Sequence, residues 1–374
     1  MTEVLTEVLT PMDVAGRPAR LRARLREAGL PALLVTRLPN VRYLTGFSGS
    51  AAMLLVTADD LLLVTDGRYQ TQALEQLRAA GVDARVEIGL TSADQHRILA
   101  GALGPRGPLG LEAQGVTWAE QRTLAGVFAD VELIPTESHV EELRCIKDAG
   151  EVARIRAACA IADAALAEML PSLGDHPTER DFAVELEHSM RRGGASAMSF
   201  DPIVASGPNG AKPHARPSER AIGEGELVVI DFGCIVDGYC SDMTRTVSVG
   251  DPGPDGRRLW DLVAASQRAG RDAVRPGVAC AAVDRASRHV IEEAGLGDAF
   301  VHGTGHGVGL EIHEAPRVAR TAPGTLGVGT VVTVEPGVYL PGVGGVRIED
   351  TVVVTEDGAE ALTEFPKSLV VAPS

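Results

Sequence analysis

Four carboxylates lie within two valine-rich stretches of the C-terminal half, and they constrain the fold more than any other feature of the sequence. The first stretch, ELVVIDFGCIVDGYCSDMTRTVSV, carries Asp231 and Asp242 around an Asp-Gly turn signal at Asp237-Gly238. A hairpin with an even-length loop places both carboxylates on one face, directly opposite or diagonal to each other. Because Asp231 ends an apolar run, burying its charge without a partner would be costly.

The second stretch, TVVTVEPGVYLPGVGGVRIEDTVVV, repeats this arrangement with Glu335 and Glu349. An odd-length loop of three or five residues around Gly342 brings both glutamates to one face. Arg347 could neutralise one of the four acids, whereas two divalent cations supply the charge that all four require. In the stretch VHGTGHGVGLEIHE, His306 is the natural nitrogen ligand. Oxygen ligands with one imidazole suit manganese, cobalt, zinc or iron better than calcium.

The length and the pattern of the chain indicate two domains, since 374 residues exceed one ordinary core. Alternating helix and strand signals predict an α/β domain over residues 1–140, with AAMLLVT and LLLVTD as a hairpin and no convergent chemistry of its own. Long helices and valine-rich strands follow, which assigns an α+β domain to residues 141–374. The stretch EELRCIKDAGEVARIRAACAIADAALAEML is expected to be one helix that ends at Pro171. Further helices are expected at HPTERDFAVELEHSMRRGG, at 257–275 and at 279–294.

Composition limits the classes of partner. The formal net charge of −16 argues against binding to nucleic acid or to an anionic membrane surface. Apolar runs such as LLLV are too short for a membrane span, and the N-terminus lacks the features of a signal peptide, so we expect a cytoplasmic protein. The five cysteines form no CxxC pair, which argues against a disulfide framework and a cysteine zinc site.

The motifs IDFG, SDMTRT, GTGHGVGLEIHE, VEPGVY and VRIEDTVVV occur in an order that resembles the pita-bread peptidases. That family holds methionine aminopeptidase, aminopeptidase P and prolidase, and its relatives include creatinase. The stretches NVRYLTGFSGS and TDGRYQTQA resemble the creatinase/prolidase N-terminal domain, which distinguishes the chain from methionine aminopeptidase. The resemblance implies a C-terminal pita-bread fold, preceded by a smaller α/β creatinase-type domain, and a homodimer or a higher oligomer.

Carried over to this sequence, the resemblance implies the roles of five metal ligands. Asp231 would bind one ion, and His306 with Glu335 would bind the other. Asp242 and Glu349 would bridge the two ions. Manganese is the expected metal, with cobalt, zinc and iron as alternatives.

The resemblance also implies the residues that act on the substrate. His214 and His313 correspond to two substrate-facing histidines, and Glu335 is the candidate that carries a proton to the leaving nitrogen. Three more residues correspond to pocket or supporting positions, for which a structural role is equally open: His302, Tyr339 and Arg347.

The implied activity is hydrolysis of Xaa-Pro bonds, and we expect an Xaa-Pro aminopeptidase of the aminopeptidase P type. The alternative is an Xaa-Pro dipeptidase, or prolidase, which needs a group that binds the carboxylate of proline. Arg317, four residues after His313, could be that group. A binding protein that keeps the fold without catalysis is a third hypothesis, although no ligand position is lost. A helical zinc protease is disfavoured because the sequence lacks HExxH.

Overall fold

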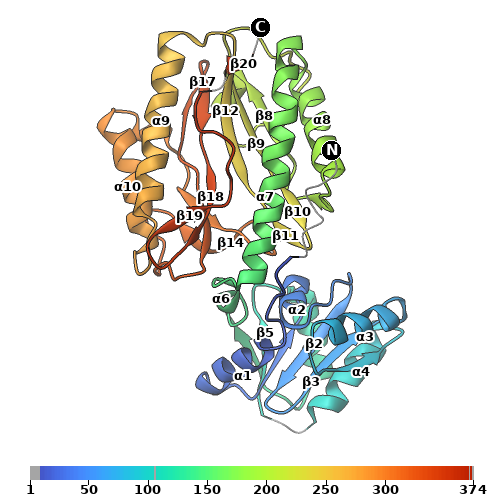
Figure 1. The fold of residues 1–374 in the computed structure, drawn as a ribbon. Coiled ribbons are helices and arrows are strands. Elements are labelled where there is room, and N and C mark those ends of the chain that lie inside the picture. The colour runs from blue at the N-terminus through green and yellow to red at the C-terminus, as the bar shows by residue number, and fades with distance from the viewer. Residues whose placement is uncertain (1–8, 105–106, 370, 373–374) are drawn as a thin grey trace. The chain divides into compact units, whose positions relative to one another are not determined.

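The computed structural model describes residues 9–104, 107–369 and 371–372, and the chain divides into two compact units (Figure 1). The smaller unit is Met12–Arg144, and the larger unit comprises the described residues of Met1–Pro11 and Cys145–Ser374. Each unit encloses hydrophobic core residues of its own.

The smaller unit is built around a six-stranded sheet with the order β4-β3-β2-β1-β5-β6. Its strands are β1 (Ala32–Val35), β2 (Ala52–Thr57), β3 (Leu61–Thr65), β4 (Arg85–Ile88), β5 (Leu109–Glu112) and β6 (Leu133–Thr136). Its helices are α1 (Arg17–Glu27), α2 (Leu38–Thr45), α3 (Gln70–Ala79), α4 (Ser92–Leu103), α5 (Trp118–Val127) and α6 (Glu141–Arg144), with the 3-10 helix η1 (Gly67–Tyr69). Strands β2 and β3 form the predicted antiparallel hairpin, whereas β1 and β5 pair in parallel. The α/β organisation expected from the sequence is confirmed.

The larger unit combines antiparallel sheets with two pairs of long helices. Its longer helices are α7 (Ala149–Met169), α8 (Glu179–Arg192), α9 (Gly253–Ala273) and α10 (Cys280–Glu293). Its short helices are η2 (Leu170–Asp175), η3 (Gly207–Ala211) and η4 (Gly297–Ala299). One sheet has the order β20-β12-β9-β8, and a five-stranded sheet has the order β14-β13-β15-β18-β19. The remaining strands form the sheets β11-β10-β7 and β16-β17.

The strands of the larger unit have the following bounds. They are β7 (Ala197–Met198), β8 (Ile203–Ser206), β9 (Leu227–Phe232), β10 (Cys234–Val236), β11 (Tyr239–Cys240), β12 (Met243–Val249), β13 (Gly305–Gly307), β14 (Glu314–Val318), β15 (Val331–Val334), β16 (Gly337–Leu340), β17 (Gly344–Arg347), β18 (Asp350–Val354), β19 (Ala359–Ala361) and β20 (Val371–Ala372).

The helix pairs bury their apolar faces against the strands. Residues of α7 and α8, such as Ile161 and Phe182, share a core with Ile230 of β9. Trp260 of α9 packs in a second core with Val346 of β17. Figure 1 shows the two helix pairs on either side of these strands, whose ends carry the acids singled out in the sequence. The two layers of helix therefore enclose the hairpins that hold the candidate site.

The prediction of one long helix from residue 141 to Pro171 is wrong in one respect, because the structure has two helices there, α6 and α7, with a break between them. The Asp148 carboxylate accepts a hydrogen bond from the backbone N–H of Glu151, and the Glu151 carboxylate accepts one from the N–H of Asp148. This reciprocal cap begins a new helix at Ala149.

The segment Ala149–Asp175 is, within the described residues, long and apolar enough to cross a membrane, with a mean hydropathy of 1.3. Its apolar side chains include Ile155, Ile161 and Leu166, which are buried inside the larger unit. Because a buried core helix has the same composition as a membrane span, this helix is weak evidence for one.

Candidate metal centre and active site

The hairpin that carries Asp231 and Asp242 has the predicted register. Strands β9 and β12 pair antiparallel with Asp231 opposite Thr244, so Asp242 lies diagonal to Asp231 on the same face. The hairpin continues through β10 and β11 to a two-residue turn at Asp237 and Gly238, whose φ angles are 44° and 82°. Positive φ at both positions is typical of the tight turn that an Asp-Gly pair favours. The even-length turn and the shared face are confirmed.

The second hairpin closes through a loop of three residues, 341–343, between Leu340 and Gly344. Three is one of the two loop lengths, three or five, that the sequence predicted. Glu335 and Glu349 lie between the β16–β17 ladder and the β15–β18 ladder, in one continuous register. At these two residues the backbone N–H groups bond to segments outside the hairpin. The N–H of Glu335 donates to Thr304 O at 2.8 Å, and the N–H of Glu349 donates to Thr244 O at 3.1 Å. The second bond joins the two hairpins, and the first ties Glu335 to the segment before β13.

The five expected ligands therefore converge. Ligand oxygens of Asp231, Asp242 and Glu349 lie within 4.8 Å of one another. The Nε2 atom of His306 lies 3.5 Å from Oδ2 of Asp242 and 3.4 Å from Oε1 of Glu335. Acids from two hairpins and an imidazole from β13 thus surround one small volume.

The glycines around His306 allow strands to approach, which explains their density in VHGTGHGVGLEIHE. A Cβ on Gly305 would lie 2.0 Å from the carbonyl oxygen of Thr333 in β15. A Cβ on Gly307 would lie 2.3 Å from the carbonyl oxygen of Ala315 in β14. Since β13 runs between these two strands, side chains at those positions would push His306 out of place.

The electrostatics of the cluster favour bound cations. Burial raises the pKa of Asp242 well above its ordinary value, and the neighbouring charge of Glu349 adds to that effect. Burial likewise raises the pKa of Glu349, with Glu335 as the next cause. Burial is also the main reason that the pKa of Glu335 rises to about 8. The ionised forms of these three carboxylates are therefore short of compensating positive charge.

The donor set fits two divalent ions. Within the described residues, Oδ1 of Asp231 is buried without a hydrogen-bond partner, whereas its Oδ2 accepts from Arg347 Nη2 at 2.6 Å. One guanidinium cannot compensate four acids. Burial lowers the pKa of His306, which keeps its imidazole in the neutral form that binds metals.

Arg347 connects the cluster to its surroundings. Its Nη1 donates to the Tyr339 hydroxyl at 2.7 Å and to the carbonyl oxygen of Pro213 at 3.1 Å. The Tyr339 hydroxyl lies 2.8 Å from Nε2 of His302. Burial lowers the pKa of His302 to about 4, so this ring is neutral. The structure thus places His302, Tyr339 and Arg347 in one hydrogen-bonded chain that ends on Asp231.

Two threonines in contact with the acids were not singled out from the sequence. Thr244 Oγ1 donates to Glu349 Oε2 at 2.6 Å. Thr333 Oγ1 donates to Glu335 Oε1 at 3.2 Å and accepts from the N–H of His306 at 3.1 Å. Each threonine lies two residues from an acid along its strand, and therefore on the same face. That spacing is the signal that could have identified them.

His313 lies beside the cluster, on its open side. Its ring meets the ring of His306 edge to face, with 4.3 Å between the centroids. Burial lowers the pKa of His313, and the neighbouring His306 ring and Arg317 guanidinium act in the same direction. His313, just before β14, and Arg317, within β14, are both exposed.

His214 is also exposed, and it directly follows Pro213, whose carbonyl Arg347 holds. The charge of His214 contributes to lowering the pKa of both His302 and His313, so it lies within electrostatic reach of both rings. The histidines expected to face the substrate are therefore gathered around the acids.

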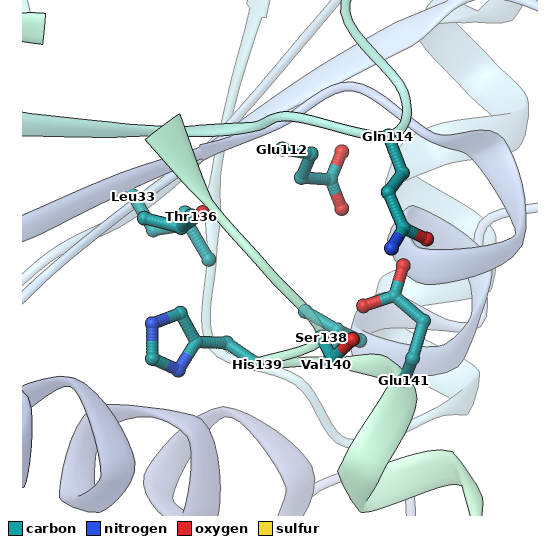
Figure 2. A pocket seen from close by; sticks show the side chains of 8 residues that line it. All are labelled: Leu33, Glu112, Gln114, Thr136, Ser138, His139, Val140 and Glu141. Carbon is teal, nitrogen blue, oxygen red and sulfur yellow. The ribbon is translucent and has the colours of Figure 1, made fainter. Parts of the chain in front are cut away.

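A separate hollow occurs in the smaller unit, at the carboxyl ends of β5 and β6 (Figure 2). It has room for about one water. Its carboxylates are already bonded, since Glu112 accepts from the N–H groups of Thr36 and Arg37 at 2.6 and 2.8 Å. Glu141 accepts from Arg37 Nη1 at 2.6 Å. These bonds tie α6 and the segment before α2 to the end of the sheet.

Comparison with known proteins adds family relationships to this geometry. Residues 153–356 match the family model described as Metallopeptidase family M24, and residues 17–146 match the Creatinase/Prolidase N-terminal domain. The Xaa-Pro dipeptidase of Pyrococcus horikoshii is 33% identical over 342 residues, which cover 91% of this chain and 95% of that protein.

Two solved structures are similar over nearly the whole chain. An Xaa-Pro dipeptidase from Bacillus anthracis has a TM-score of 0.90 and 38% identity, with 96% of this chain and 99% of that chain covered. An X-Pro aminopeptidase from Thermotoga maritima has a TM-score of 0.85 and 34% identity, with 95% and 99% covered. These matches confirm the predicted fold class, a pita-bread unit preceded by a creatinase-type α/β unit.

Proposed function

The chain belongs to metallopeptidase family M24 and is a peptidase, and from that premise we propose that it hydrolyses Xaa-Pro dipeptides. The sequence favoured an aminopeptidase of the P type, with a dipeptidase as the alternative. The similar proteins support the alternative better, because those from Bacillus anthracis and Pyrococcus horikoshii are both named Xaa-Pro dipeptidases. The non-catalytic hypothesis is not supported.

Arg317 is the observation that carries the dipeptidase proposal. Its side chain is exposed and lies within electrostatic reach of His313, and it forms no ion pair with any described residue. An unpaired guanidinium close to an acid-rich centre is suited to a carboxylate of the substrate, which it can bind through two parallel hydrogen bonds. In a dipeptide that carboxylate belongs to proline, one residue beyond the scissile bond.

The metal-binding residues in this proposal are those of the convergent cluster: Asp231, Asp242, His306, Glu335 and Glu349. When bound, two divalent ions supply Lewis-acid polarisation and a nucleophile at neutral pH. Manganese remains our choice of metal, with cobalt, zinc and iron as alternatives.

The chain's own residues orient the peptide and move its protons. His214 and His313 donate hydrogen bonds to the scissile carbonyl oxygen, where negative charge develops. Glu335 accepts a proton on its carboxylate and passes it to the proline nitrogen as the bond breaks. Arg347 fixes Oδ2 of Asp231 and leaves Oδ1 free for metal.

A panel of three substrates tests the proposal on the metal-loaded protein. The dipeptide Ala-Pro, its amide and the tripeptide Ala-Pro-Ala share the scissile bond but differ in the position of the carboxylate. We expect rapid turnover of Ala-Pro and little turnover of the other two. Comparable kcat/KM values for the tripeptide would instead indicate an aminopeptidase. If none of the three is cleaved, the Xaa-Pro assignment itself is rejected.

A further inference from the structure

Lys147 is a buried lysine, which is rare in proteins unless the charge is paired. It lies in the segment between α6 and α7, and its side chain is 1% exposed. Its Nζ lies 2.7 Å from Oε1 of Glu314, whose side chain is 6% exposed. Among the described residues this Nζ has no hydrogen-bond partner, so the ion pair with Glu314 is the contact that balances its charge. The lysine therefore depends on Glu314 for its charge balance.

The backbone holds both members of this ion pair. The N–H of Lys147 donates to the carbonyl oxygen of Gly329 at 2.9 Å. Glu314 begins β14 and is paired with Gly307 of β13, the strand that carries His306. The ion pair thus ties the entry to α7 to the sheet of the metal cluster.

Glu314 directly follows His313, and neighbouring residues of an extended strand point to opposite sides. The glutamate side chain is directed inward to Lys147, while His313 is exposed and meets the ring of His306. Fixing the inward side chain therefore fixes the direction of the outward imidazole.

The neighbouring glycine is adapted to this arrangement. A Cβ on Gly309 would lie 2.3 Å from Oε1 of Glu314, so a side chain there would displace the carboxylate. The carbonyl oxygen of Gly309 accepts a hydrogen bond from the N–H of Cys240 at 2.8 Å. The turn that leads to His313 is thus held by β11 on one side and leaves room for the ion pair on the other.

We propose that Lys147 and Glu314 form a positioning pair that holds His313 against the substrate. The pair touches neither substrate nor metal and acts through the strand that it anchors. The inference rests on the proposed function, which assigns His313 to the scissile carbonyl. A pair that served stability alone could be broken without changing kcat.

A double-mutant cycle tests the pair. Lys147→Met removes the 2.7 Å ion pair of the buried Glu314 carboxylate, so we expect this carboxylate to swing toward solvent and to move His313 with it. A displacement of His313 by about 1 Å should lower kcat by about 100-fold. We expect KM to change only a few-fold and the bound metal per chain to stay at the parent value. The melting temperature is measured so that all rates refer to folded protein.

The double variant Lys147→Met/Glu314→Gln removes both charges, and the neutral amide has no tendency to leave the interior. We expect it to recover kcat to within about 10-fold of the parent, which is a strongly non-additive result. Arg180→Met is the control, since it breaks an exposed ion pair with Glu219 and should leave kcat unchanged.

Two kinetic results would overturn the proposal. One is a kcat for Lys147→Met close to that of the parent at equal metal content. The other is a double variant as slow as Lys147→Met. If Lys147→Met does not fold, the double variant alone decides, because its side chain at position 314 is neutral and should stay directed inward. A 100-fold loss of kcat in that variant contradicts the proposal that an inward side chain there places His313.

Crystal structures provide a readout that does not depend on the substrate. The separation of the His306 and His313 rings, 4.3 Å in the parent, should widen in Lys147→Met and return in the double variant. An unchanged separation in Lys147→Met rejects the positioning role. This readout stands even if the parent cleaves no Xaa-Pro dipeptide, so failure of the proposed function and failure of the pair are distinguishable.

Discussion

Arg317 differs from many arginines of the chain in having no acidic partner among the described residues. Its replacement by Met should raise KM for Ala-Pro by about 10- to 100-fold, which corresponds to the loss of charged hydrogen bonds to the proline carboxylate. Because the guanidinium lies one residue beyond the reacting bond, kcat should fall less. Steady-state kinetics on the dipeptide measure both parameters.

The matched control is Arg320→Met, which removes an arginine already paired with Glu292 at 2.8 Å. It should leave KM at the parent value. Unchanged kinetics in Arg317→Met would show that another group binds the carboxylate, or that no group does.

Thr244 supports the cluster through its hydroxyl, which donates to Glu349 and accepts from Arg347 Nε at 3.1 Å. Thr244→Val keeps the shape of the side chain and removes both bonds, so metal affinity should fall by about 10- to 100-fold. Competition with a chelator, followed by metal content per chain, measures the loss.

Thr330→Val is the comparison for that experiment, because it deletes a buried hydroxyl that accepts from the N–H of Gly327. Equal metal affinities in the two valine variants would contradict a role for Thr244 in orienting Glu349.

At the scale of residues, the acids were predictable because an unpaired charge inside a valine-rich strand is costly to bury. Their partners were harder to predict. Arg347 was expected to neutralise one acid, and it pairs with Asp231. The hydroxyl of Thr244 reaches Glu349 from a strand about a hundred residues away in sequence, so only the tertiary fold makes that contact visible. The same is true of Lys147 and Glu314.

Strand β13 is the element most sensitive to added volume. Gly307→Ala would bring a Cβ to 2.3 Å from backbone atoms of β14, where no side-chain rotation relieves the contact. We expect a loss of at least about 1–3 kcal/mol in the free energy of unfolding and reduced metal content. Chemical denaturation and metal analysis report the two effects.

Gly101→Ala serves as the control, because a Cβ at that position in α4 meets nothing within 4 Å. It should be neutral or stabilising by about 1 kcal/mol. A Gly307→Ala protein with parent stability and metal content would contradict the close approach of β13 and β14.

The segment that carries His214 is anchored by Glu179, at the start of α8. Its buried carboxylate accepts from the N–H of Ser206 at 2.7 Å, from Ser218 Oγ at 2.6 Å and from Asn209 Nδ2 at 3.0 Å. Burial raises the pKa of Glu179, but these hydrogen bonds outweigh it and leave the pKa below its ordinary value of 4.5.

Glu179→Gln should cost about 2 kcal/mol of stability at neutral pH, since an uncharged amide accepts these bonds less well. A lowered carboxyl pKa stabilises the fold above the unfolded pKa, and that contribution is lost as pH falls through the folded pKa. The stabilities of parent and variant should therefore differ at pH 7, and the difference should shrink as pH falls below 4.5 and through the lowered folded pKa. Denaturation curves at several pH values measure this, and a constant difference down to pH 3 would contradict the assignment.

At the scale of elements, the turn and loop lengths followed from sequence because Asp237-Gly238 and Gly342 accept positive φ, which fixes the register of each hairpin. The break between α6 and α7 did not follow, because an apolar period runs through it. It depends on the reciprocal cap of Asp148 and Glu151, which the hydrophobic pattern concealed.

At the scale of the whole molecule, two units with cores of their own agree with the expected pairing of an α/β fold with a pita-bread fold. The order of the motifs along the chain was sufficient for this, because each motif marks one strand of the metal-bearing hairpins. The homodimer, the cytoplasmic location and the choice of manganese remain predictions, since no contact between chains and no ion informs them.

The central claim is that the clustered acids and His306 hold two metal ions on which peptide hydrolysis depends. A titration of metal-free protein, with metal per chain and Ala-Pro hydrolysis measured on the same samples, tests it most directly. We predict saturation at two ions per chain with activity rising in step, and loss of both in a folded Asp242→Ala variant. Hydrolysis by the metal-free protein, or parent-level activity in Asp242→Ala, would contradict the account.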